Sequence, residues 1–320
     1  MKLAGAFLKL IRWPNLIFIA LTQSLFYYCV LLPGFPASEN ADHVNVLKPE
    51  QFWLLCLSSV MIASAGYIIN DYFDLNIDRV NKPGRIIVEK VIKRRWTIVW
   101  HWVLSVMGIL IGFYLSWRLK NIIIGPANLI CVAALWFYST TFKKRLLVGN
   151  IIISLLTAWV MLVLYFCEFR LHRFIDPVYQ HYLSRLFKFA LVYGSFAFII
   201  SLVREVIKDI EDMDGDARYG CRTMPIVWGV HVSKFFVATW LLVVIVSLAI
   251  IQFYVLQYRW WWGILYSIVF VIIPLLQILR KLYFASATAD FHRLSNMIKA
   301  VMLAGILSMI FFKMNTLWIA

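Results

Sequence analysis

Long apolar stretches, separated by short polar segments, run along the whole chain. Nine of them reach about 20 residues, the length that a helix needs to cross the hydrocarbon core of a bilayer. Their approximate bounds are 15–32, 52–70, 97–117, 121–141, 147–167, 186–206, 232–256, 261–279 and 297–317. This pattern predicts an all-α integral membrane protein in which nine transmembrane helices form a single domain over residues 1–320.

Composition supports the membrane prediction. Hydrophobic residues make up 62% of the chain and charged residues 15%, with a mean hydropathy of +0.80. A soluble domain has about 45–50% apolar and about 25% charged residues.

The five cysteines are scattered, mostly within apolar runs, and have no metal-ligand spacing. Neither a zinc site nor a disulfide framework is indicated.

The net charge of +15 is explained by topology and anionic membrane lipids, and we infer no nucleic-acid partner. If the N-terminus is cytoplasmic, the inside segments hold or border 22 of the 31 Lys and Arg residues. The positive-inside rule favours that orientation. In a prokaryote, the membrane would be the plasma membrane.

Two acidic clusters stand out in this carboxylate-poor chain. Segments 70–78 and 204–216 hold nine of its sixteen Asp and Glu residues, and each lies at the end of an apolar span. Carboxylates at the edge of a bilayer are costly to desolvate, so they indicate a functional site. In the predicted topology both clusters face the cytoplasm.

The spacing of these aspartates predicts metal chemistry. Asp71, Asp74 and Asp78 follow an i, i+3, i+7 pattern that places them on one helical face, and the second cluster repeats the pattern. Carboxylates so arranged repel one another unless a cation is present, and Mg²⁺ binds carboxylates together with substrate phosphates. The predicted metal ligands are Asp71, Asp74, Asp78, Asp209, Asp212 and Asp216.

Polar and basic residues near the clusters are candidate ligands for a diphosphate. They are Asn70, Arg85, Lys143, Lys144, Lys208 and Arg222. A cation-coupled transporter is the alternative from another class, since it would also place carboxylates in membrane helices. Its coupling site is expected near the bilayer midplane, whereas these carboxylates lie at span ends.

The stretch NDYFDLNIDRVNKPGR at 70–85 resembles the first aspartate-rich motif, NDxxDxxxD, of the UbiA superfamily of intramembrane prenyltransferases. The stretch REVIKDIEDMDGDARYGCRTM at 204–224 resembles its second motif. Residues 12–15 are similar to the family's RPxN entry to the first span, and 138–150 to the segment after its fourth span. Within the superfamily, the second motif is most similar to the branch that contains digeranylgeranylglyceryl phosphate synthase.

The resemblance implies a helical bundle around a central cavity and transfer of a prenyl group from an isoprenyl diphosphate to a lipophilic acceptor, with Mg²⁺ as cofactor and release of diphosphate. It implies as catalytic residues Asp71, Asp74, Asp78, Asp212 and Asp216. The acceptor is either the hydroxyl of a (geranylgeranyl)glyceryl phosphate or an aromatic ring of the hydroxybenzoate, naphthoate or homogentisate type. Segment 85–90 departs from the family pattern, RPLPSG, beside the active site. The acceptor, the prenyl chain length and the oligomeric state therefore stay open.

Overall fold

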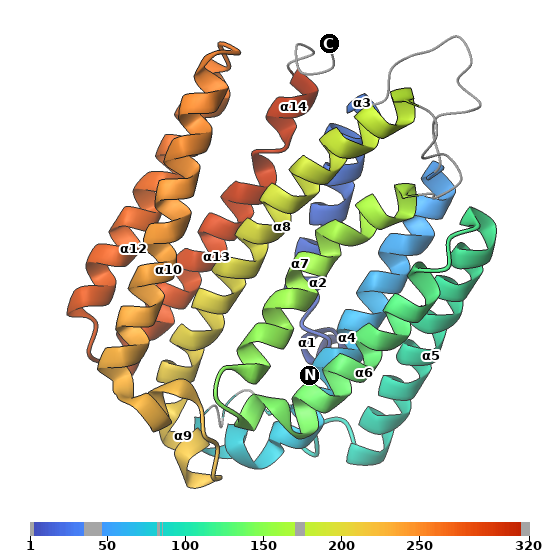
Figure 1. The fold of residues 1–320 in the computed structure, drawn as a ribbon. Coiled ribbons are helices and arrows are strands. Elements are labelled where there is room, and N and C mark those ends of the chain that lie inside the picture. Colours follow the sequence, from blue (N-terminus) through green and yellow to red (C-terminus); the bar gives the residue numbers. More distant parts are fainter. Residues whose placement is uncertain (1–2, 35–46, 82–83, 85, 170–176, 315–320) are drawn as a thin grey trace.

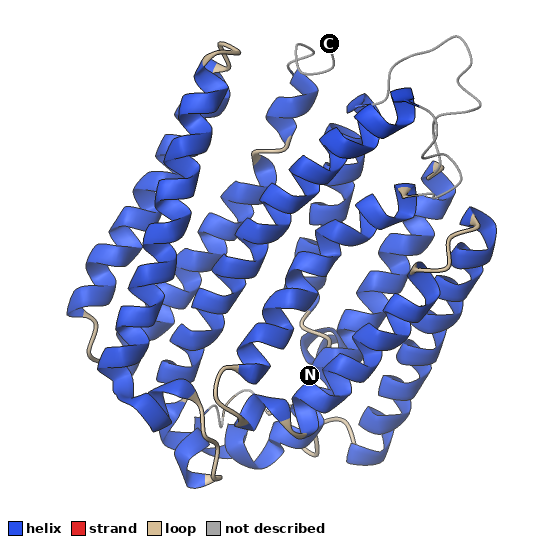
Figure 2. Cartoon of the chain, viewed as in Figure 1, coloured by secondary structure: helices blue, strands red, loops and turns tan. Residues whose placement is uncertain are grey.

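The computed structural model describes residues 3–34, 47–81, 84, 86–169 and 177–314. Helices make up almost all of these residues (Figure 2). The one β contact among them is an isolated parallel bridge between Val88 and Ile92. The predicted all-α class is confirmed.

Eight helices in the described part of the chain are long and apolar enough to cross a membrane. Four are single helices in the first half and middle of the chain: α4 (Pro49–Asn81), α5 (Arg94–Leu119), α7 (Val148–Glu168) and α8 (Pro177–Glu211). A fifth is α10 (Met224–Leu256). The predicted span at 121–141 corresponds to α6 (Ile124–Thr140), a shorter apolar helix of 17 residues.

The other three spans are composite. The first joins α2 (Trp13–Leu25), the π-helix η1 (Phe26–Leu31) and α3 (Leu32–Gly34). Another joins α11 (Trp261–Ser267), the π-helix η5 (Ile268–Ile272) and α12 (Ile273–Phe284). The last contains α13 (Thr288–Leu307) and α14 (Ile310–Met314).

Both helices that carry the acidic clusters extend beyond the predicted apolar windows. Helix α4 continues through residues 70–81, which carry the first acidic cluster, and ends two residues before Pro83, a residue that cannot continue a helix. Helix α8 continues to Glu211. Both ends reach the side of the bundle where the short helix α9 (Met213–Arg218) lies (Figure 1).

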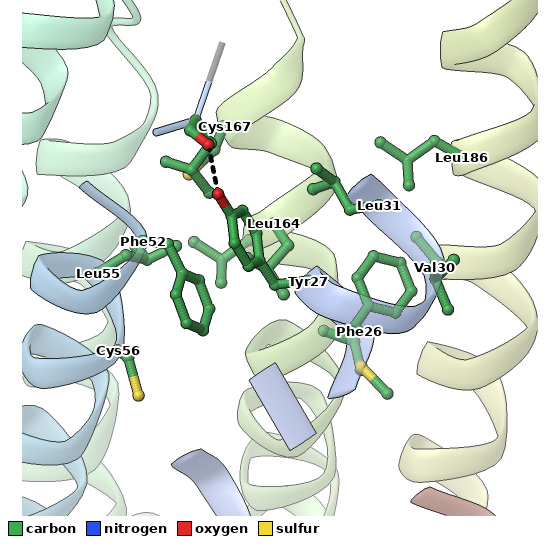
Figure 3. Packing of buried hydrophobic residues seen from close by; sticks show 14 of the residues in the cluster. Phe26, Tyr27, Val30, Leu31, Phe52, Leu55, Cys56, Leu164, Cys167 and Leu186 are labelled. Carbon is green, nitrogen blue, oxygen red and sulfur yellow. Dashed lines mark hydrogen bonds between the residues drawn. The ribbon is translucent and has the colours of Figure 1, made fainter. Parts of the chain in front are cut away.

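The core consists of two large apolar clusters. One joins η1 with α4 and α7, at the end of the bundle away from α9 (Figures 1 and 3). There, the Tyr27 ring stacks on Phe52 at 4.2 Å, and its hydroxyl donates to the Leu47 carbonyl at 2.8 Å. The other cluster joins α8, α10, α12 and α13.

A third, smaller cluster positions the start of the chain. Helix α1 (Leu3–Leu10) buries Ala6 and Leu10 against α4 and the segment 86–92. Arg12 follows with a positive φ of 52° and connects α1 to α2. Because α1 packs beside the polar end of α4, this turn directs Arg12 toward the first acidic cluster.

Candidate functional site

In the first cluster, Asp71 on α4 forms an ion pair with Arg12, the residue between α1 and α2. Arg12 Nη2 donates to Asp71 Oδ1 at 2.7 Å, and the Arg12 guanidinium also lies 5.2 Å from the centre of the Tyr67 ring. Burial lowers the pKa of Arg12, but the charge of Asp71, the hydrogen bond to Asp71 and contributions from Tyr67 and Asp78 together raise the pKa overall. The guanidinium is therefore a permanent positive charge beside this carboxylate.

Asp74 is held on both of its oxygens. Asn70 Nδ2 donates to Oδ2 at 2.7 Å, and Lys143 Nζ contacts Oδ1. Asn70 Oδ1 is buried and accepts no hydrogen bond from the described residues. Asp78 lies one turn further along α4, half-buried, and its charge acts on Arg12. The three aspartates thus share one helical face, as predicted.

Lys143 lies between the two clusters. It belongs to the 3₁₀ turn η3 (Phe142–Lys144), and its side chain is only 11% exposed. Burial lowers its pKa to about 8, although the negative charges of Asp216 and Asp71 act in the opposite direction. Contact with Asp74 and electrostatic interaction with Asp216 place this amine within reach of both acidic segments.

The second cluster spans a break between helices. The expected single helix through Asp209, Asp212 and Asp216 is interrupted, because α8 ends at Glu211 and α9 begins at Met213. Asp212 occupies the junction, with φ −95° and ψ 6°. The Asp216 amide still donates to the Asp212 carbonyl at 3.1 Å. The short second helix therefore keeps Asp216 one turn from Asp212.

Two asparagines fix this second cluster. Asn150 Nδ2 on α7 donates to Asp209 Oδ2 at 2.8 Å. Asn81, the last residue of α4, donates from Nδ2 to the Asp212 carbonyl at 3.0 Å. The two acidic segments are thus joined directly through α4 and α9.

The other predicted diphosphate ligands differ in their positions. Lys144 is exposed on the same turn as Lys143, and its carbonyl accepts the Arg222 amide at 2.8 Å. Lys208 Nζ lies 3.7 Å from Glu205 Oε2. Arg85 lies outside the described residues.

Within the described residues, no three Asp, Glu, His or Cys side chains converge closely enough to form a metal site by themselves. Arg12, Lys143 and Asn150 contact the carboxylates instead. The available donors are carboxylate and amide oxygens, which suit a hard cation. Mg²⁺ takes few protein ligands and completes its shell with waters and phosphate oxygens, so the residues fit a metal that arrives with a diphosphate.

Arg12, Asn81 and Asn150 contact the acidic clusters but were not among the predicted site residues. Arg12 and Asn150 each lie in a segment that resembles a family landmark, so a signal was present for both. Asn81 had no such signal, since its role arises from the approach of α4 to α9.

The model of the UbiA prenyltransferase family matches residues 16–309. Digeranylgeranylglyceryl phosphate synthase of Methanothermobacter thermautotrophicus is 33% identical over 190 residues, 58% of this chain and 60% of that protein. The enzyme of the same name from Sulfurisphaera tokodaii is 32% identical over 232 residues, 72% of this chain and 77% of that protein. The match thus spans less than two thirds of the first relative's length.

Solved structures share the fold. A structure of digeranylgeranylglyceryl phosphate synthase superimposes with a TM-score of 0.58 at 23% identity, over 97% of this chain and 99% of the other. A UbiA homologue from Archaeoglobus fulgidus, bound to GPP and Mg²⁺, superimposes with a TM-score of 0.55 at 12% identity, over 95% and 99%.

Proposed function

Because the chain belongs to the UbiA prenyltransferase family, we propose that it transfers a geranylgeranyl group from its diphosphate to the free hydroxyl of geranylgeranylglyceryl phosphate. The products are the digeranylgeranyl ether lipid and diphosphate. The choice of acceptor is supported by relatives named digeranylgeranylglyceryl phosphate synthase, one of which aligns over 72% of this chain.

The protein is an integral, multi-pass membrane protein, and we propose that its active site faces the cytoplasm.

The observation that carries this proposal is the convergence of two acidic segments and Lys143 at one end of an apolar bundle. A prenyl diphosphate has a polyanionic head and a long hydrocarbon tail. Its head needs cations at the polar end, and its tail needs the apolar interior. Lys143 can contact the diphosphate while it remains beside the aspartates.

In this proposal Asp71, Asp74 and Asp78 would hold one Mg²⁺, and Asp212 and Asp216, helped by Asp209, a second. Bound Mg²⁺ neutralises the negative charge of the departing diphosphate. Asn70 and Asn150 orient Asp74 and Asp209 through hydrogen bonds. Arg12 and Lys143 neutralise Asp71 and Asp74 before substrate binds, so the carboxylates can stay close together without a metal.

The test is an assay of purified protein in lipid nanodiscs, with radiolabelled geranylgeranyl diphosphate and Mg²⁺. Geranylgeranylglyceryl phosphate and an aromatic acid are offered as separate acceptors. We expect ether product from the glyceryl phosphate only. Product from the aromatic acid alone would assign the chain to quinone biosynthesis. No product from either compound would argue against the glyceryl phosphate acceptor and against the aromatic acceptor.

A further inference from the structure

Two charged side chains, Arg204 and Glu205, lie on α8 deeper in the bundle than the aspartates, and the proposed function gives them no role. Glu205 precedes Asp209 by four residues, which places it about 6 Å further from the polar end on the same helical face. Its side chain is only 13% exposed. Charged groups within membrane helices are costly, and those that occur indicate function.

The surroundings of Glu205 form a second polar layer beneath the aspartates. Arg204 Nη1 donates to Glu205 Oε1 at 2.8 Å, and Lys208 Nζ lies 3.7 Å from Oε2. Tyr67 on α4 and Tyr138 on α6 are close enough for electrostatic interaction with this carboxylate. Tyr67 precedes Asp71 by four residues, so it also lies one helical turn deeper. Three helices therefore contribute to this layer.

The position of this layer relates it to the reacting bond. This step rests on the proposed function, in which the diphosphate binds at the aspartates. The prenyl tail must then extend past this layer toward the apolar interior, since the aqueous side lies at the other end. C1 of the donor, whose bond to oxygen breaks, consequently faces the layer that contains Glu205.

We propose that Glu205 is the catalytic base that accepts the proton of the acceptor hydroxyl. The C1–O bond of the donor breaks, and its electron pair leaves with diphosphate. A lone pair of the acceptor hydroxyl forms the new C–O bond with C1, and the hydroxyl proton passes to a Glu205 oxygen. Release of that proton to the aqueous side restores the carboxylate, so each turnover yields one ether, one diphosphate and one proton.

A base is needed because the bundle must exclude water, which would otherwise capture the allylic cation. With water excluded, the proton must pass to a protein group or to the departing diphosphate. In the proposed function the six aspartates bind Mg²⁺, so Glu205 is the carboxylate on this face of α8 to which no metal is assigned. Arg204 fixes the position of the Glu205 carboxylate through its hydrogen bond to Oε1 at 2.8 Å.

The test compares Glu205→Gln with Glu211→Gln in the holoenzyme. Glu211 is a matched control, because it lies on the same helix, is also 13% exposed and pairs at 2.7 Å with His292, a residue to which the proposed function gives no role. For Glu205→Gln we expect binding of geranylgeranyl diphosphate and Mg²⁺ within about threefold of wild type, and transfer to the hydroxyl acceptor lowered roughly 100-fold or more. For Glu211→Gln we expect donor binding and transfer to the acceptor both to stay within about threefold of wild type.

A thiol analogue of the acceptor separates base catalysis from a structural role. A thiol ionises near pH 8.5 and needs little help to lose its proton, so the deficit of Glu205→Gln should shrink to less than about tenfold. An equal deficit with both acceptors, or loss of donor binding, would overturn the assignment. If Glu205→Gln does not yield folded protein, Glu205→Asp, which keeps a carboxylate, should show the same selective defect in milder form.

The outcomes also separate the two proposals. Ether product from wild type together with equal yield from Glu205→Gln would overturn the role of Glu205 alone, and would indicate that diphosphate takes the proton. Absence of ether product from wild type would overturn the proposed function and this inference together.

Discussion

The side chain of Asn81 lies directly against the backbone of Gly215, so that a Cβ atom on Gly215 would stand 2.1 Å from Asn81 Oδ1. The same asparagine donates to the Asp212 carbonyl at 3.0 Å. Glycine at position 215 is therefore what allows the end of α4 to contact the junction between α8 and α9. The distance between the two acidic segments depends on this contact.

Substituting Gly215 by Ala should force the Asn81 amide away and break its hydrogen bond. The direct loss is about 1 kcal/mol of stability, and the shift between the clusters should lower kcat/KM roughly tenfold or more. Steady-state kinetics and a thermal melt measure the two effects. Gly194→Ala on α8 is the control, since a Cβ there meets its nearest atom, on Leu162, at an ordinary 3.5 Å. Equal activity of the two variants would contradict this role of Asn81.

Removing an aspartate from either cluster should abolish turnover. Asp71→Ala and Asp212→Ala each remove a proposed metal ligand, and loss of several kcal/mol of charge stabilisation lowers the rate by roughly 100-fold or more. Both variants should still insert in membranes and purify as folded protein. Asp214→Asn is the control, because Asp214 is exposed and outside the i, i+3, i+7 pattern. Normal turnover in either purified Ala variant would refute the site assignment.

Lys143 should contribute more to donor binding than its neighbour Lys144. Lys143 contacts Asp74 between the clusters, whereas Lys144 is exposed. A charged hydrogen bond contributes about 1.5–3 kcal/mol, so Lys143→Gln should weaken the Kd for prenyl diphosphate about 10- to 100-fold. Lys144→Gln should change this Kd by less than about threefold. Equilibrium binding measures both, and the reverse order would place the diphosphate on the outer side of this turn.

Removal of divalent metal should stop catalysis without unfolding the protein. Chelation with EDTA is expected to reduce transfer to background, and added Mg²⁺ should restore it. The melting temperature should change little, because Arg12 and Lys143 already neutralise Asp71 and Asp74. Addition of Mg²⁺ with prenyl diphosphate should raise the melting temperature, since both bind only the folded state. Unfolding on chelation alone would indicate a structural metal instead.

The sequence predicted the fold class and the approximate positions of the helices, because apolar side chains along a membrane helix form long unbroken runs. The window 147–167, for example, corresponds to Val148–Glu168. Hydropathy placed the helix ends less well where polar residues continue the helix beyond the hydrocarbon core. Residues 71–81 of α4 therefore fall outside the predicted apolar window 52–70, although they continue the same helix. The break at Asp212 was also not predicted, because helical spacing alone carries no sign of it.

The candidate site was predicted in part. Spacing placed Asp71, Asp74 and Asp78 on one face of a helix, since that relation is local. The partners of the aspartates come from distant segments: Arg12 and Asn150 each lie 59 residues from the aspartate that they contact. The resemblance of residues 12–15 and 138–150 to family segments marks both regions, but a single sequence does not specify which aspartate each residue contacts.

Helix α6 has a consequence for the lipid around the protein. Its 17 residues extend about 26 Å, less than the roughly 30 Å thickness of a typical hydrocarbon core. Leu129, Ile130 and Phe137 expose apolar side chains on it, which suits contact with lipid acyl chains. Such a mismatch is relieved by local thinning of the bilayer. Helix α6 leads directly into the turn that carries Lys143. The thickness of the bilayer, and the length of its acyl chains, should therefore affect the position of Lys143 at the polar end of the bundle.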